Sequence, residues 1–116
     1  MFLVLFFSVS CARLELDLLD DLTLKMKENR RNLEISKEVL KTFLATNQKK
    51  MDKCVEEFLA LSSEEKKERY LSFNRHFYDK GGLFDLADRF LSDSEFNALF
   101  NELKEKMKPF FAEENL

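Results

Sequence analysis

The stretch that decides the fold runs from Leu33 to Leu61 and reads LEISKEVLKTFLATNQKKMDKCVEEFLAL. Its large apolar residues recur at steps of three, four or seven, with Lys37 and Asn47 as polar interruptions, and this spacing places side chains on one helical face. We predict a single helix here, the longest of the chain, with a break near residues 45–48 as the alternative. Other helices must cover its apolar face. That face consists of Leu33, Leu40, Leu44, Met51, Cys54, Phe58 and Leu61.

The composition favours one helical domain. The chain has 116 residues, of which 45% are hydrophobic and 35% charged, and only two Gly and one Pro are available for tight turns. So few turn residues argue against a sheet with many hairpins. The net charge of -3 gives no basis for nucleic-acid binding. We therefore predict an all-α fold, a single-domain antiparallel bundle of four or five helices over residues 13–116.

Capping signals and glycines set the bounds of the other helices. Ser62 with Glu65, and Ser92 with Glu95, have the spacing of a capping box. The pair Gly81-Gly82 favours a helix end before it, because glycine readily adopts the left-handed conformation. The expected helices are residues 13–31, 62–78, 83–91 and 92–107.

The first twelve residues have the pattern of a secretory signal peptide. Residues 1–12 carry no charged side chain, and Ser10 and Ala12 stand at the small-residue positions before a cut at Arg13. The segment is too short to span a bilayer, which takes about 20 apolar residues. We predict secretion with cleavage. The alternatives are a lipid anchor on Cys11 and an intracellular protein that keeps residues 1–12 as part of its structure.

Cleavage would leave Cys54 as the only cysteine of the mature chain. An unpaired cysteine in an oxidising compartment is either buried or joined to a second chain by a disulfide. Cys54 lies on the apolar face of the predicted long helix, which favours burial. An intermolecular disulfide through Cys54 stays open as the second interpretation.

The residues needed for catalysis are sparse. A single histidine excludes the common His-rich zinc sites and limits nucleophilic triads to one candidate set. Ser72, His76 and Asp79 share a helical face, but this spacing is common on soluble helices. We therefore predict a protein that is not an enzyme, with no metal site and no cofactor.

Phenylalanine is the unusual feature of the composition, with 13 Phe, two Tyr and no Trp. Phenyl rings need apolar surroundings, so they form either a packed core or the lining of a ligand cavity. In the second case Lys41, Lys49 or Arg75 would meet the carboxylate of a fatty acid. The pair Phe110-Phe111 follows a proline and is also a candidate anchor for a protein partner. The candidate ligand-binding residues are Phe73, Phe77, Phe84, Phe90, Phe96 and Phe100.

In composition and helix content the chain is similar to secreted helical lipid carriers of parasitic worms, a likeness that rests on no motif and transfers no site residues. We expect a secreted, non-enzymatic protein that binds a hydrophobic small molecule, such as a fatty acid, in its Phe-rich interior. The alternative is a secreted protein-interaction module, dimeric through Cys54 or through the Phe110-Phe111 end.

Overall fold

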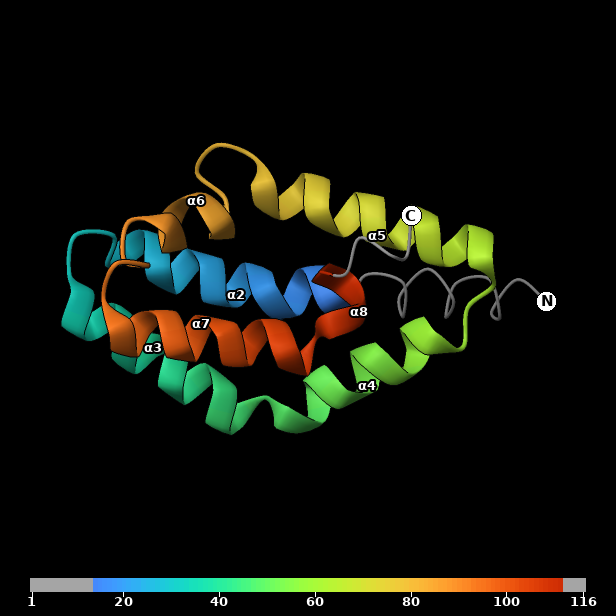
Figure 1. Cartoon of the computed structure of the whole chain (residues 1–116), viewed down its shortest axis with the longest axis horizontal. Coiled ribbons are helices and arrows are strands. Elements are labelled where there is room, and N and C mark those ends of the chain that lie inside the picture. Colours follow the sequence, from blue (N-terminus) through green and yellow to red (C-terminus); the bar gives the residue numbers. More distant parts are fainter. Residues whose placement is uncertain (1–13, 112–116) are drawn as a thin grey trace.

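Seven α-helices make up most of residues 14–111, the part of the chain that the computed structural model describes (Figure 1). No strand occurs in these residues, which confirms the predicted all-α fold class. The predicted signal peptide, residues 1–12 with Cys11, lies outside the described residues. Five helices are long and two, α6 and α8, are short. The helices are α2 (Leu14–Glu28), α3 (Leu33–Thr46), α4 (Gln48–Leu59), α5 (Ser63–Tyr78), α6 (Leu83–Asp88), α7 (Ser94–Lys106) and α8 (Lys108–Phe111).

The prediction of one continuous helix from residue 33 to residue 61 is wrong, because Asn47 divides this stretch into α3 and α4. The Asn47 side-chain amide and its backbone N–H both donate to the Phe43 carbonyl, at 3.1 and 3.0 Å. The Asn47 carbonyl accepts from the N–H of Met51 at 2.9 Å. Asparagine competes for backbone hydrogen bonds in this way, which ends one helix and begins the next. The apolar face remains buried on both helices, at Leu40, Leu44, Met51, Cys54 and Phe58.

The central helix of the bundle is α2, and not the stretch from residue 33 to residue 61. It packs against α3, α4, α5 and α6. Figure 1 shows α2 between α5 and α6 on one side and α3 and α4 on the other. Leu19, Leu22 and Met26 follow the three-and-four spacing of a helical face and are fully buried.

Lys37 interrupts the apolar face of α3 because it forms ion pairs with α7. Its side chain is only 11% exposed, and its Nζ lies 3.2 Å from Asp93 Oδ2 and 3.6 Å from Glu95 Oε1. Glu34 adds a third carboxylate at 3.4 Å. The hydrogen bond to Asp93 raises the pKa of Lys37, against the opposing effect of burial. Lys37 therefore joins α3 to the beginning of α7.

One of the two predicted capping boxes is confirmed. At the start of α5, the Glu65 N–H donates to Ser62 Oγ at 3.3 Å and the Ser62 N–H donates to Glu65 Oε1 at 3.2 Å. The second box, between Ser92 and Glu95, is wrong by one residue. Asp93 caps α7 instead, and its Oδ2 accepts from the Phe96 N–H at 2.9 Å. The Asp93 carboxylate also pairs with Lys37, which a serine hydroxyl at position 92 would do only weakly.

The turn after α5 uses both glycines. Gly81 has φ +82°, a conformation that L-residues with a side chain rarely adopt. Gly82 donates its N–H to the Asp79 carbonyl at 2.8 Å, and a Cβ at Gly82 would lie 2.7 Å from the Phe77 carbonyl oxygen. The predicted helix end at the Gly81-Gly82 pair is confirmed, and the turn brings α6 back onto α2.

Candidate functional site

The six phenylalanines predicted to bind a ligand form two groups of contacting rings, Phe73 with Phe77, and Phe84 and Phe90 with Phe96 and Phe100. The Phe111 ring contacts both groups and joins them into one cluster. Phe73, Phe77, Phe96 and Phe100 are buried, while Phe84 and Phe90 are half-buried. Ring centroids lie 4.9 Å apart for Phe73 and Phe77, 5.3 Å for Phe90 and Phe96, and 6.0 Å for Phe84 and Phe100. These are the separations of aromatic pairs packed in a core. A ligand-binding role for the six rings stays a prediction.

Phe110 and Phe111, predicted as an anchor for a partner, pack into this cluster. The Phe110 ring is fully buried, with its centroid 4.7 Å from that of Phe58 and 5.0 Å from that of Phe73. Phe111 is half-buried and lies 5.3 Å from Phe73 and 5.5 Å from Phe84. Asn74 holds α8 in place by donating to the Phe110 carbonyl at 2.8 Å. An exposed anchor at this end would have to come from Phe111 alone.

Cys54 is a free thiol in the interior, with 0% of its surface exposed. Burial raises the pKa of Cys54 to about 12, and the nearby carboxylates of Glu15 and Glu57 act in the same direction. The thiolate is the species that forms disulfides, so Cys54 is poorly suited to react with a second chain in this conformation. The predicted disulfide through Cys54 would require α4 to leave the core.

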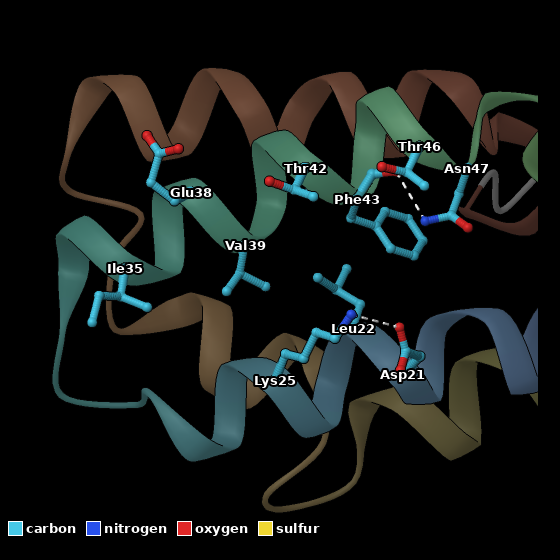
Figure 2. A pocket seen from close by; sticks show the side chains of 10 residues that line it. All are labelled: Asp21, Leu22, Lys25, Ile35, Glu38, Val39, Thr42, Phe43, Thr46 and Asn47. Atoms are coloured by element: carbon cyan, nitrogen blue, oxygen red, sulfur yellow. Dashed lines mark hydrogen bonds and ion pairs between the residues drawn. The ribbon is translucent and has the colours of Figure 1, made fainter.

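A groove lies between α2 and α3, lined by side chains of both helices (Figure 2). It encloses about 360 Å³ and is open to solvent along one side. Leu22 of α2 points toward α3, and Val39 and Phe43 of α3 point toward α2. Leu22 is fully buried and Phe43 nearly so, which makes the floor apolar. The remaining lining residues are Asp21, Lys25, Ile35, Glu38, Thr42, Thr46 and Asn47.

Local hydrogen bonds fix how α2 and α3 meet at one end of this groove. Asn32 caps α3 by accepting from the Ile35 N–H at 3.0 Å. The Ser36 hydroxyl is fully buried and donates to the Asn29 carbonyl at 3.1 Å, across the corner between the two helices. This short, hydrogen-bonded corner sets α3 back against α2, so that the Val39 and Phe43 side chains face Leu22.

The rim of the groove is polar, and its charged groups are paired. Lys25 Nζ lies 3.2 Å from Asp21 Oδ2, and both side chains are 57% exposed. Glu38 Oε1 lies 3.8 Å from Lys41 Nζ, which also approaches Glu95. Thr42 and Thr46 add two exposed hydroxyls to the rim. Exposed pairs of this kind are weak, at roughly 0.2–1 kcal/mol each.

None of the three cations expected to meet a fatty-acid carboxylate lines this groove. Lys41 pairs with Glu38 on its own helix and with Glu95 of α7, and Lys49 is exposed on α4. Arg75 lies on a different, charged pocket of about 380 Å³ between α2 and α5. Lys25 is the cation that the groove itself supplies.

The second pocket holds the Ser72, His76 and Asp79 set that the sequence singled out. The partner of the histidine is on another helix, because His76 Nε2 lies 2.7 Å from Asp20 Oδ1 of α2. Both side chains of this pair are about half exposed. The lining residues besides Leu16 are polar or charged. The contact joins α5 to α2.

Residues 14–111 contain neither a metal-binding cluster nor a membrane-spanning helix. In this range no group of three or more His, Cys, Asp or Glu residues has a geometry that would hold a metal ion. The same residues contain no helix with the length and apolarity needed to cross a membrane.

The groove was missed by the sequence analysis, although one signal for it exists. Ile35, Val39 and Phe43 recur every four residues and form a second apolar row beside the main face of α3. This second row indicates that other helices must pack against two faces of α3. Which face would remain partly open depends on how α2 packs, and local spacing carries no information about that.

Comparisons with known proteins add no relative. No family model matches the chain, and neither a curated protein nor a solved structure matches it at a significant level. The likeness to helical lipid carriers of worms therefore rests on composition and helix content alone.

Proposed function

We propose that the protein is a secreted, non-enzymatic binding protein for a small apolar molecule, which it holds in the groove between α2 and α3. The observation that carries this proposal is the groove itself, where the exposed Ile35 and the half-buried Val39 present apolar surface beside the buried Leu22 and Phe43. Concave, mostly apolar sites with a few polar groups at the mouth are typical of small-molecule binding.

The size of the groove limits the ligand. Its volume of about 360 Å³ lies at the small end of the range of roughly 300–1,000 Å³ that is typical of ligand pockets. A medium-length alkyl chain or a small ring system fits this volume. A longer chain would extend past Ile35, which is 45% exposed and lines the groove.

We place the ligand in the groove and not in the Phe-rich interior, because the interior rings already contact one another. Phe73, for example, has three neighbouring ring centroids within 5.3 Å, those of Phe77, Phe110 and Phe111. A ligand between these rings would have to separate them, and close-packed cores resist such expansion. The groove, in contrast, is partly open to solvent.

The secretion part of the proposal is supported by the pattern of residues 1–12. Expression of the full chain in a eukaryotic host, followed by intact-mass measurement of the medium, tests it. We expect a mature chain that begins at Arg13. Full-length protein that stays in the cell and keeps residues 1–12 would contradict secretion, and it would leave the binding proposal standing.

A pair of matched valine variants tests the binding proposal. Val39→Phe puts a larger side chain into the groove, while Val55→Phe makes the same change at another half-buried helical position, on α4. Binding of the neutral fluorophore 1-aminoanthracene should be saturable in the unchanged protein. Val39→Phe should weaken it by about tenfold or more, and Val55→Phe should change it little. Equal effects of the two variants would contradict a site in the groove.

A further inference from the structure

We infer that the groove selects an uncharged, hydroxyl-bearing apolar ligand over a fatty acid of the same length. This inference rests on the proposed function and names its ligand class. It replaces the carboxylate-to-lysine contact expected from the sequence with a contact between neutral polar groups.

Lys25 is the cation on the rim of the groove, and it is already paired. Lys25 Nζ is already 3.2 Å from Asp21 Oδ2, and Figure 2 shows this pair at the mouth of the groove beside Leu22. A ligand carboxylate could bind Lys25 only by competing with Asp21 for the same ammonium group. The exchange replaces one ion pair with another and leaves Asp21 beside a second negative charge, which is unfavourable.

The charged lining residues besides Lys25 are two carboxylates, those of Asp21 and Glu38. A ligand carboxylate that enters this rim therefore meets two groups of its own sign, and the nearby cations are already paired, Lys25 with Asp21 and Lys41 with Glu38. An ionised carboxylate also loses more hydration on partial burial than a hydroxyl does.

The groove also offers uncharged polar groups that a neutral ligand could bind. Thr42 and Thr46 carry hydroxyls on the rim, and each is both a donor and an acceptor. The Asn47 side chain lies at the same end of the groove, where its NH₂ group is engaged with the Phe43 carbonyl. A ligand hydroxyl can exchange hydrogen bonds with these uncharged groups while its alkyl chain covers Val39 and Ile35.

The test compares decan-1-ol with decanoate, which have the same chain and differ in the charge of the head group. Isothermal titration of the full chain with each ligand, near neutral pH and below the solubility limit of the alcohol, gives two dissociation constants. We expect decan-1-ol to bind about fivefold more tightly than decanoate. Asp21→Asn frees Lys25, and it should strengthen decanoate binding several-fold while it changes decan-1-ol binding little.

Asp17→Asn is the matched control, because Asp17 is also exposed on α2 but lines the other pocket. It should leave the ratio of the two dissociation constants unchanged. Decanoate binding that equals or exceeds decan-1-ol binding in the unchanged chain overturns the inference and leaves the proposed function intact. If Asp21→Asn leaves the ratio of the two dissociation constants unchanged, the inference is also overturned. Failure of both ligands to bind overturns the proposed function together with the inference.

Discussion

Arg69 of α5 holds Glu15 of α2 through two hydrogen bonds, from Nε to Oε2 at 2.8 Å and from Nη2 to Oε1 at 2.7 Å. The Glu15 side chain is only 3% exposed and that of Arg69 16%. The two residues are 54 positions apart in the chain, so the pair fixes how two distant helices meet. Two parallel bonds between a guanidinium and a carboxylate also fix the orientation of both groups.

Removal of Arg69 should therefore be costly. Arg69→Met leaves the Glu15 carboxylate buried without its partner, and we expect the free energy of unfolding to fall by about 3 kcal/mol. The double variant Glu15→Leu with Arg69→Met removes both charges and should recover most of this loss. Urea denaturation followed by circular dichroism measures both. A loss below about 1 kcal/mol in the single variant would mean that the pair contributes little.

Phe73→Ala tests whether the aromatic cluster is a packed core. Phe73 is fully buried among other rings, so its truncation should create a cavity and cost about 3–5 kcal/mol of unfolding free energy. Calorimetry measures the unfolding free energy of this variant. Leu71→Ala, an exposed change on the same helix, is the control. A small loss at Phe73 would indicate a loose interior that could accept a ligand.

The Cys54 thiol should be unreactive in the folded protein. Burial raises its pKa to about 12, so almost no thiolate is present near pH 8, and the sulfur is also inaccessible. In a Cys11→Ser background, a colorimetric thiol reagent should label Cys54 only in concentrated guanidinium chloride. Ser63→Cys in the same background adds an exposed thiol that should react at once. Rapid native labelling of Cys54 would restore the possibility of a disulfide-linked dimer.

The Asp93 carboxylate should support folding in a pH-dependent way. The hydrogen bond from the Phe96 N–H and the contact with Lys37 lower its pKa below the ordinary value of 3.8, although partial burial opposes this. Because the folded-state pKa is the lower one, the stabilisation is fully present above 3.8 and is lost as pH falls through the folded-state value.

Asp93→Asn keeps a capping side chain but removes the charge, so it isolates this effect. The variant should melt at a lower temperature than the unchanged protein at neutral pH, and the difference should shrink in acid. Asp88→Asn, an exposed change at the end of α6, should show no such trend. A melting-temperature difference that is constant down to strongly acidic pH would contradict the role of the Asp93 charge.

Most of the fold could be predicted from the sequence because its signals are local. The three-and-four spacing identified the buried face of α3 and α4 at Leu40, Leu44, Met51, Cys54 and Phe58, and Ser62 with Glu65 marked the start of α5. Asn47 was harder, because the polar interruption fits either an exposed turn within one helix or a boundary between two. Its side-chain hydrogen bond to Phe43 decides between them. Asp93 was missed because Ser92 also fits the capping pattern, and the choice depends on Lys37 from a distant helix.

The candidate site could not be predicted in the same way. The groove is formed by Leu22 on α2 and by Val39 and Phe43 on α3, and it exists because these two helices leave space between their side chains. Such a space depends on crossing geometry and on the corner at Ser36, which local spacing does not determine. The buried pair of Glu15 and Arg69 was missed for a related reason. Glu15 lies on the buried face of α2, but its partner is 54 positions away, and local spacing does not reveal such a pairing.

Methyl nuclear magnetic resonance with added decan-1-ol tests the central claim most directly. If the groove between α2 and α3 is the binding site, the methyl signals of Leu22 and Val39 should shift first and saturate together. The Val55 signal, from the same residue type on α4, should stay in place. Saturating shifts centred on the methyl groups of the fully buried Leu103 would move the site into the interior. Shifts that never saturate would contradict a specific site on this protein.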